Sequence, residues 1–278
     1  MARNRYGFDE DKIARFYKEG RGSGRGADYK PWLTVRDVPS AGRSHRPHGL
    51  KTGRVHHLLS DIERDLFLVL DWTDAVRDIR EQFPLDRAVT QRIAEQLGIP
   101  HPVDRQSRTS LVMTTDFVVD RVEDGRLVLF ARAVKPMEKL DEPRTIAKLE
   151  IERRYWAEQG VNWGIVTERD LPDVTVRNIE RIHNCARIND LVQPYPGCYA
   201  EKAALIAREI PAYSHQTMRI FCADMDLRLA LDGGTCLMLL RHLLVTKAVA
   251  CDLSISLDDE ALMSRFNVRP PVDRKVSA

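Results

Sequence analysis

The chain has 278 residues, of which 43% are hydrophobic and 30% charged, and its formal net charge at pH 7 is +2. This length is ample for a sizeable core in one large or two small domains, and the composition is that of a globular chain. A fibrous or intrinsically disordered protein is excluded, because such chains lack this apolar content or this sequence variety.

The cysteines and the apolar segments indicate the cellular compartment of the protein. The five cysteines are odd in number and form no Cys-x-x-Cys pair, which argues against a disulfide framework and a zinc site. No apolar run approaches the length of a membrane span, and the polar N-terminus has no signal-peptide core. We therefore expect a cytoplasmic protein with reduced thiols and no membrane partner.

Charge is distributed unevenly along the chain. Residues 1–57 contain 13 Lys and Arg against 6 Asp and Glu, a balance of +7 that leaves about −5 for the remainder. Histidines and aromatic residues are interspersed in this basic part. Such a segment suits a nucleic-acid backbone, whose counterions are released on binding. The alternative is a basic terminus that is merely solvated.

The first expected elements are a helix and a long irregular segment. Residues 9–19 have the pattern of a short amphipathic helix, which ends at the glycine-rich run GRGSGRG. Residues 30–56 have no sustained period and contain several turn formers. We expect them to form an extended basic segment with a functional role and not a core element.

A second helix is predicted over residues 57–71. Its apolar stripe is formed by Leu58, Ile62, Leu66 and Val69. Glu63 lies inside the same arc, where a carboxylate is costly unless it meets a cation or hydrogen-bond donors. Either its head reaches solvent past its neighbours, or it serves a cation bound nearby.

A strand and a polar helix follow, over roughly residues 76–83 and 90–97. The most informative stretch is TTDFVVDRVEDGRLVLFARAVK, residues 114–135, which reads as two strands joined by a tight turn. With the Asp-Gly pair at the centre of the turn, antiparallel register places Asp116 opposite Ala133 and Thr114 opposite Lys135. Asp116 and Lys135 then project from one face, because side chains repeat every two residues.

This pair of side chains indicates a kind of chemistry. A metal-dependent phosphodiesterase needs a carboxylate that holds a divalent cation and a second group that orients or deprotonates a water. Asp116 and Lys135 suit these two roles. The alternative is a cross-strand ion pair on a solvated sheet face.

The rest of the chain completes an α/β domain and adds a second one. A helix over residues 143–159 and a strand over 161–168 close the first domain, predicted to span 1–170. The second domain, 171–278, is expected to be mainly helical and to resemble a winged helix with an unpacked tail, RPPVDRKVSA. Its helices are predicted over residues 174–188, 200–210, 217–231 and 235–244, with a strand-like run over 245–257.

The last of these helices bears on what the second domain binds. A helix that reads bases is normally rich in Arg, Lys, Asn or Gln. The segment TCLMLLRHLL is mostly apolar and offers Arg241 and His242 alone. This composition favours packing or protein contact over base readout.

Taken together, Glu63 on a helix, Asp116 on a strand and Lys135 on the next strand follow the order of the restriction-endonuclease-like PD-(D/E)xK nucleases. Several longer runs are more specific. The chain closely resembles the TnsA family, the endonuclease subunits of heteromeric cut-and-paste transposases, in the runs ADYKPWLTV, AGRSHR, KTGRVHHLLSD, DIREQFPL, TTDF and KLEIERRYW. The similarity is dense from about residue 9 to residue 167 and thin thereafter.

The resemblance implies a fold, an activity and partners. The fold would be a restriction-endonuclease-like mixed sheet flanked by helices, followed by the second domain. The first domain would cut the strands at the 5′ ends of the transposon, while the transposase TnsB cuts and joins the 3′ ends, and the second domain would contact the ATP-dependent regulator TnsC. Glu63 and Asp116 would be acidic ligands of Mg²⁺, for which Mn²⁺ can substitute, and Lys135 would position the water.

One position departs from the family's pattern. The residue two before the lysine is usually Glu or Gln in these nucleases, where it helps to hold the metal, and here it is Ala133. Because an alanine side chain has no oxygen, the missing ligand would be the carbonyl of Val134, a water, or Glu152 on the next helix. The alternative for Glu152, and the preferred one for Glu150, is i,i+4 ion pairing on a solvated face.

Candidate DNA contacts lie in the basic segment, since a loop can follow a phosphate backbone. The two adjacent histidines at the start of the predicted helix are included, although the ordinary alternative is that one packs and the other is solvated. The residues assigned to the DNA-facing surface are Arg43, His45, Arg46, Lys51, Arg54, His56 and His57.

The sequence therefore predicts a Mg²⁺-dependent DNA endonuclease subunit of a transposase complex, whose partners are transposon-end DNA, TnsB and TnsC. Two alternatives stay open. A free-standing restriction-type nuclease would need a base-reading surface, which the sequence does not show. A catalytically degenerate nuclease fold that only docks DNA and a partner is supported by Ala133.

Overall fold

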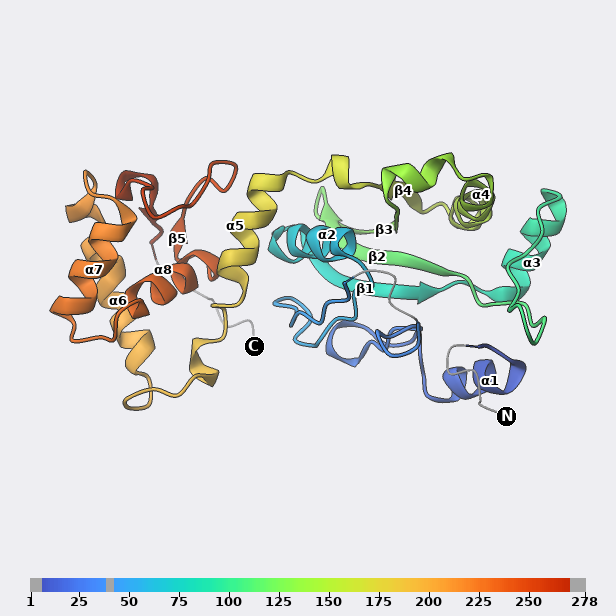
Figure 1. The fold of residues 1–278 in the computed structure, drawn as a ribbon, viewed down its shortest axis with the longest axis horizontal. Coiled ribbons are helices and arrows are strands. Elements are labelled where there is room, and N and C mark those ends of the chain that lie inside the picture. Colours follow the sequence, from blue (N-terminus) through green and yellow to red (C-terminus); the bar gives the residue numbers. More distant parts are fainter. Residues whose placement is uncertain (1–6, 39–42, 271–278) are drawn as a thin grey trace. The chain divides into compact units, whose positions relative to one another are not determined.

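The computed structural model describes residues 7–38 and 43–270. The chain divides into two compact units, Met1–Leu171 and Pro172–Ala278 (Figure 1). Among the described residues, no helix combines the length and the apolar character that crossing a bilayer requires. The five cysteines carry free thiols, as the sequence predicts.

A four-stranded mixed sheet forms the centre of the first unit. Its strands, in the spatial order β1-β2-β3-β4, are Val76–Pro84, Thr114–Glu123, Arg126–Val134 and Asn162–Val166. The β1–β2 and β2–β3 pairs are antiparallel, and β3 and β4 are parallel. A parallel pair requires a crossover connection, which here contains a helix. The mixed sheet expected from the sequence is confirmed.

The β2–β3 hairpin has the turn that its sequence predicts. Asp124 and Gly125 both have left-handed backbone conformations, with φ of 48° and 75°. Positive φ at both central residues is the geometry of a type I′ turn, whose twist matches that of the flanking strands. The register pairs Glu123 with Arg126 and continues to Phe117 opposite Arg132. One step further, Asp116 is level with Ala133, as the sequence predicts.

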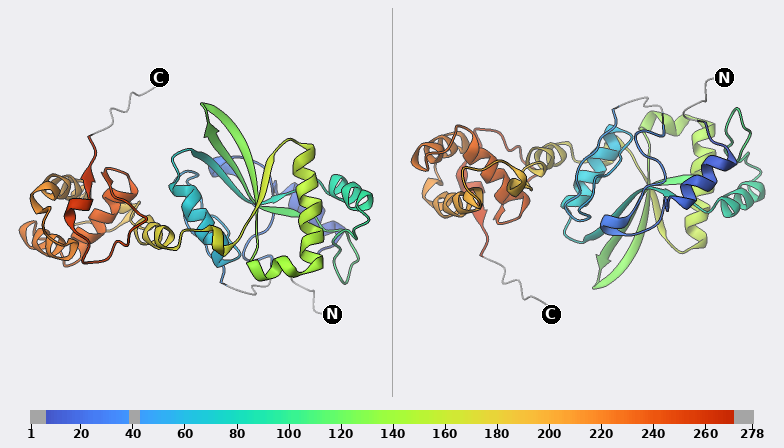
Figure 2. Two further views of the ribbon diagram at one scale, coloured as in Figure 1. Left: turned by 90° about the horizontal axis from the view of Figure 1, so that it is seen from above. Right: turned by 90° about the horizontal axis from the view of Figure 1, so that it is seen from below.

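Helices cover the sheet on both sides. They are α2, Asp61–Trp72; α3, Arg87–Gln96; and α4, Pro143–Glu158. Figure 2 shows α2 (cyan) and α4 (yellow-green) on opposite sides of the strands. The main core includes Val118 and Ala131 from the sheet, Ile93 from α3, and Ile151 and Trp156 from α4. Burying a valine or isoleucine side chain in this core stabilises the fold by about 1.5–3 kcal/mol.

The helix expected from residue 57 begins four residues later. Ser60 is its N-cap, and the Ser60 hydroxyl oxygen accepts a hydrogen bond from the Glu63 backbone N–H at 3.1 Å. Capping by serine satisfies a backbone donor that the first turn leaves without a partner. His57 and Leu58 are instead extended, and Leu58 forms an isolated bridge with His45. The prediction of a helix from the apolar period is confirmed, but the predicted first residue is wrong.

The N-terminal segment packs against the outer edge of β1, the edge that does not pair with β2. It begins with α1, Glu10–Lys18, a helix that the sequence predicts. The Trp32 N–H donates to the carbonyl of Gln82 at 3.1 Å, and the Tyr29 hydroxyl donates to the carbonyl of Glu81 at 3.0 Å. Trp32 is fully buried beside Phe16. These contacts cover a sheet edge that would otherwise be open to pairing with another chain.

The second unit is helical and is organised around one apolar helix. Its helices are α5, Asp173–His183; α6, Cys198–Glu209; α7, Met218–Arg228; and α8, Thr235–Val245. Helix α8 packs against the other three, and most of its leucines are buried. The Asp226 carboxylate accepts hydrogen bonds from the N–H groups of Gly234 and Cys236, each at 2.7 Å, and so satisfies the first turn of α8. This helix packs internally, as its composition indicates.

The β-ribbon predicted over residues 245–257 is wrong in its extent. Only β5, Val249–Ala250, is a strand, and it pairs with β6, Asn267–Val268. The loop after β5 is bonded instead to the buried Asn178 of α5. The Asn178 amide donates to the carbonyls of Leu253 and Ile255 at 2.8 and 2.9 Å, and its oxygen accepts from the Leu257 N–H at 3.1 Å. A segment bonded in this way cannot form a strand ladder. Most of the predicted tail, 271–278, lies outside the described residues.

Asn178→Ala tests this account of the loop. We expect faster amide hydrogen exchange over residues 253–257 and a free energy of unfolding of the second unit lower by about 2–3 kcal/mol, because three backbone groups, two of them in buried hydrogen bonds, lose their partner. Hydrogen exchange followed by mass spectrometry measures the effect. Asn184→Ala, an exposed position at the end of the same helix, is the control. Equal exchange in both variants would contradict the account.

Candidate active site

Asp116 lies at the start of β2 and contacts the end of β3. Its Oδ2 accepts a hydrogen bond from the Val134 backbone N–H at 2.6 Å and one from the Lys135 Nζ at 2.7 Å. The same Lys135 Nζ donates to the carbonyl of Val134 at 2.7 Å. The hairpin therefore brings a carboxylate, a carbonyl and an ammonium together at one point.

Glu63 stands in the first turn of α2 with its carboxylate turned back toward the helix start. Oε2 accepts from the Leu59 N–H at 3.0 Å, and Oε1 accepts from the Ser60 hydroxyl at 3.1 Å. Glu63 is only 6% exposed, so its head does not reach solvent. The bonds resemble a capping box, and the positive end of the helix dipole favours a carboxylate there.

Gln82 joins these two carboxylates. Its Nε2 lies 3.4 Å from Oε2 of Glu63 and 3.4 Å from Oδ1 of Asp116. Sequence reasoning missed this residue, since nothing marks one amide in a strand as a site residue. The structure places Gln82 level with Asp116, because the neighbouring pairs are Glu81–Phe117 and Phe83–Thr115.

Glu152 reaches the site from α4. It is 5% exposed, and its Oε1 accepts hydrogen bonds from the Thr115 hydroxyl at 2.8 Å and from the Trp163 Nε1 at 3.0 Å. It lines a cleft of about 270 Å³ together with Asp116 and Lys135. The i,i+4 pairing considered for Glu152 is therefore wrong. For Glu150 it is right, since that carboxylate pairs with Arg153 and Arg154 on the surface.

Burial and the charge of Asp116 raise the pKa of two carboxyl groups in this site. Burial, and then the charge of Asp116, raise the pKa of Glu63 to about 7. Burial, and then the same charge, raise the pKa of Glu152 to about 7. A divalent cation would relieve both effects, because it favours the ionised form of each carboxylate.

Lys135 remains an ammonium. Burial lowers its pKa, but the Asp116 carboxylate beside it outweighs that effect, and the pKa lies above its usual value. The half-buried side chain therefore donates hydrogen bonds and does not accept a proton.

The oxygens around this ammonium fit a metal ion. Asp116 Oδ2 and the Val134 carbonyl converge on the Lys135 Nζ, so two of the three predicted ligands already face one positive charge. Carboxylate and carbonyl oxygens are the ligands that Mg²⁺ and Mn²⁺ prefer. Within residues 7–38 and 43–270, no three His, Cys, Asp or Glu side chains gather as a metal-binding group. Ala133 is fully buried and offers no oxygen from its side chain.

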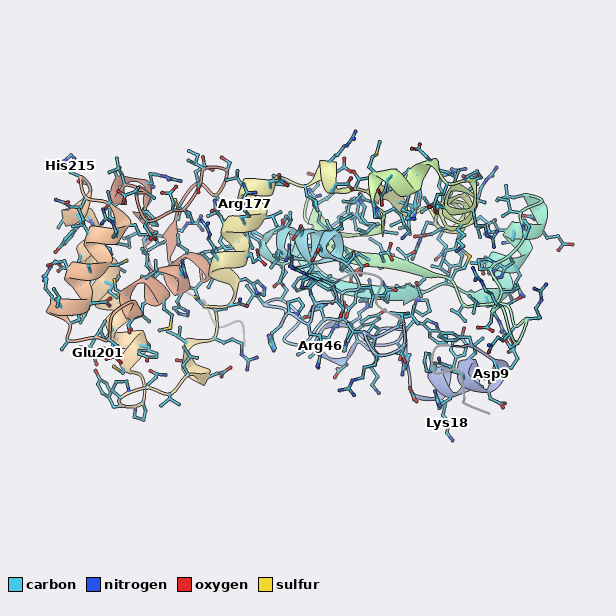
Figure 3. The ribbon with its side chains drawn as sticks, in the orientation of Figure 1. Asp9, Lys18, Arg46, Arg177, Glu201 and His215 are labelled. Carbon is cyan, nitrogen blue, oxygen red and sulfur yellow. The ribbon has the colours of Figure 1, made fainter. Side chains whose placement is uncertain are left out.

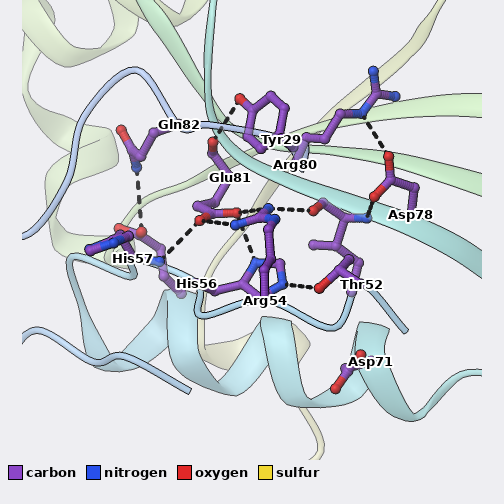
Figure 4. A network of polar contacts seen from close by, with 12 residues as sticks. Tyr29, Thr52, Arg54, His56, His57, Asp71, Asp78, Arg80, Glu81 and Gln82 are labelled. Carbon is purple, nitrogen blue, oxygen red and sulfur yellow. Dashed lines mark hydrogen bonds and ion pairs between the residues drawn. The ribbon is translucent and has the colours of Figure 1, made fainter. Parts of the chain in front are cut away.

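Two of the predicted DNA contacts are buried, which corrects their assignment to the surface. Arg54 donates from Nη1 to Oε1 of Glu81 at 2.8 Å and from Nη2 to the carbonyl of Ile79 at 2.9 Å. The ring of His56 is fully buried between Glu81, 2.8 Å from its Nδ1, and Thr52, 2.7 Å from its Nε2. Figure 4 shows this network around Glu81. Both side chains hold the segment before α2 against β1, so neither faces DNA.

Glu81 is the charge at the centre of this network. Burial raises its pKa, but hydrogen bonds from Arg54 and His56 outweigh burial and lower the pKa to about 2. The His57 N–H adds a further hydrogen bond at 3.0 Å. Glu81 is consequently ionised at neutral pH, and its partners are fixed in place.

The remaining predicted DNA contacts lie nearer the surface. Arg43 and Arg46 are exposed, and Arg46 is labelled in Figure 3. His45 is half-buried and lies 2.7 Å from the carboxylate of Asp61. The described residues include two more half-buried positions of this set, Lys51 and His57, and burial lowers the pKa of the His57 ring.

Comparison with known proteins gives agreeing results for both units. Residues 73–168 match the family described as TnsA-like endonuclease N terminal, and residues 170–253 match the family described as TnsA endonuclease C terminal. The chain is 52% identical over 184 residues to the Transposon Tn7 transposition protein TnsA of Escherichia coli. That alignment covers 66% of this chain and 66% of the relative, just under two thirds of each. Glu63 precedes the first matched range.

Glu81→Gln tests the buried network. At pH 7 we expect the free energy of unfolding of the first unit to fall by about 3 kcal/mol. This is the free energy that corresponds to lowering the pKa of Glu81 from 4.5 to about 2. Because the folded pKa is depressed, this stability is present above about pH 4.5 and is lost as the pH falls toward 2. Urea unfolding of both proteins across this range measures the difference.

The matched control is Glu158→Gln, which removes an exposed pair with Arg92 and should leave the free energy of unfolding close to that of the native chain at any pH. A difference between Glu81→Gln and the native chain that stayed constant down to pH 3 would contradict the assignment of a depressed pKa to Glu81.

Proposed function

We propose that this chain, which belongs to the TnsA family of transposon endonucleases, is a metal-dependent DNA endonuclease that acts within a transposition complex. The observation that carries the proposal is the convergence of Glu63, Gln82, Asp116 and Lys135, which come from a helix start, β1, β2 and the residue after β3. The name of the relative from Escherichia coli supports the setting in transposition.

The carboxylates of Glu63 and Asp116 and the carbonyl of Val134 would hold the cation. Mg²⁺ is proposed, with Mn²⁺ as a substitute, because every donor in this set is a hard oxygen. When bound, the ion supplies Lewis-acid stabilisation of charge on phosphate oxygens and promotes deprotonation of water. The burial of Glu63 favours cation binding, because a carboxylate removed from water is stabilised by a positive charge beside it.

Lys135 acts as a donor in the reaction. In hydrolysis, a water oxygen bonds to phosphorus, one phosphorus–oxygen ester bond breaks, and the departing oxygen takes a proton. The raised pKa of Lys135 keeps its ammonium charged, so it orients the water or stabilises negative charge on the phosphate. Asp116 fixes the ammonium by the 2.7 Å contact. A change at either residue would therefore disturb both.

The strand that is cut and the partners follow from the family resemblance and are proposals. The chain would cut the 5′ strands at transposon ends, TnsB would cut the 3′ strands, and the second unit would contact TnsC. The buried α8 supports a docking role for the second unit, since a base-reading helix must expose polar side chains. The exposed Arg43 and Arg46 are the proposed phosphate contacts.

Strand-resolved end labelling of transposon-end DNA tests the proposal. In Mg²⁺, with TnsB and TnsC present, Asp116→Ala should lower cleavage of the 5′ strand by at least about a hundredfold, because the metal loses a ligand and Lys135 loses its partner. Cleavage of the 3′ strand should persist. Glu158→Ala, at an exposed carboxylate on α4, is the control and should cleave as the native chain does.

A native chain that leaves the 5′ strand uncut while the 3′ strand is cleaved would contradict the proposal. It would favour the degenerate nuclease fold, with Ala133 as the cause. Cleavage of DNA that carries no transposon end, in the absence of any partner, would instead favour the free-standing nuclease.

A further inference from the structure

Gln82 is buried at the centre of the site, where an apolar side chain would be the ordinary occupant of a strand. It is 2% exposed, and its amide is 3.4 Å from a carboxylate oxygen of Glu63 and 3.4 Å from one of Asp116. Its Oε1 accepts a hydrogen bond from the Thr114 hydroxyl at 3.3 Å. The amide thus lies between the two acidic residues, and the hydrogen bond from the Thr114 hydroxyl fixes its other side.

The backbone of Gln82 is strained in a way that aims this side chain. Its φ is 47°, in the left-handed region, which costs a residue other than glycine about 1–3 kcal/mol. Consecutive strand residues normally point to opposite faces. Here Glu81 bonds to Arg54 and His56, just before α2, while Gln82 bonds to Glu63 in the first turn of α2. Figure 4 shows both side chains directed toward this segment.

The strained conformation is held from two sides. The carbonyl of Gln82 accepts from the Trp32 N–H at 3.1 Å, and the preceding Glu81 is fixed by its buried ion pair with Arg54. A conformation that costs free energy and is maintained by several contacts is typical of a functional position.

A primary amide can present either a donor or an acceptor at the same place. A half-turn about its last bond exchanges Nε2 for Oε1, and rotation about such a bond is soft. In this structure the NH₂ group of Gln82 faces Glu63 and Asp116, and Oε1 faces Thr114. After the half-turn, the NH₂ group can donate to the Thr114 hydroxyl oxygen, and the carbonyl oxygen faces the two carboxylates. The first orientation is satisfied without a metal, and the second becomes favourable when a cation lies between the amide oxygen and the carboxylates.

We propose that Gln82 is a ligand of the divalent cation, and that its carbonyl oxygen takes the place of the side-chain oxygen that Ala133 lacks. This inference rests on the proposed function. Without metal, the NH₂ group bridges Glu63 and Asp116. With metal, the amide would turn its oxygen toward the ion, and Glu63, Asp116 and Gln82 would hold the ion together.

The sheet register explains how one residue substitutes for the other. Gln82 on β1 and Ala133 on β3 are both level with Asp116 on β2, one on each side. An amide on either neighbouring strand can therefore reach a cation at Asp116. Amide oxygens suit Mg²⁺ and Mn²⁺ because they are hard donors.

Calorimetric titration of the full chain with Mn²⁺, without DNA, tests the proposal. Gln82→Ala should weaken Mn²⁺ binding by about tenfold or more. Adding Ala133→Gln to this variant should restore most of the loss, since the oxygen then comes from the other side of Asp116. Gln91→Ala, at an exposed position of α3, is the control and should bind as the native chain does.

Gln82→Asn guards against a failure of folding in Gln82→Ala. Asparagine tolerates the left-handed conformation and is one methylene shorter, so it should fold and also bind Mn²⁺ more weakly. Unchanged Mn²⁺ affinity in the folded Gln82 variants, together with lower thermal stability of the metal-free protein, would show a structural role and overturn the proposal. If Asp116→Ala still abolished Mn²⁺ binding, the proposed nuclease function would stand without this ligand.

Discussion

The site depends on the buried hydrogen bonds and ion pair that the ionised carboxylate of Glu81 makes with the segment before α2. A charge removed from water must be paired and hydrogen-bonded, and the donors of Arg54, His56 and the His57 backbone meet that need. These donors belong to the segment that leads into α2, so pairing them with Glu81 fixes the start of the helix against β1. The helix start carries Glu63, and β1 carries Gln82, the amide that lies between Glu63 and Asp116.

The site itself is assembled around an unfavourable concentration of negative charge. Glu63 and Glu152 are buried near Asp116, and each has a raised pKa for that reason. The ammonium of Lys135 compensates part of this charge and sits against Asp116 and a backbone carbonyl. Metal binding would add positive charge where the fold leaves too little. The same carboxylates that destabilise the metal-free site at neutral pH are then the source of its affinity for cations.

The features that the sequence could predict are those determined by local rules. The Asp-Gly turn fixes the hairpin register, so the convergence of Asp116 and Lys135 was accessible from the residues alone. The period of α2 placed Glu63 in a buried arc. What could not be predicted depends on contacts distant in sequence: Arg54 is an ordinary basic loop residue until Glu81 is brought beside it, and Gln82 is one amide in a strand until its backbone turns it toward Glu63.

Anomalous diffraction from crystals of the native chain soaked in Mn²⁺ would decide whether Glu63 and Asp116 hold one metal ion, because it places the ion without relying on activity. We expect an anomalous peak within about 2.0–2.5 Å of oxygens from both Glu63 and Asp116. A peak elsewhere in the chain, or binding to Asp116 with Glu63 still bonded only to its own helix start, would contradict the claim that these two carboxylates form one metal site.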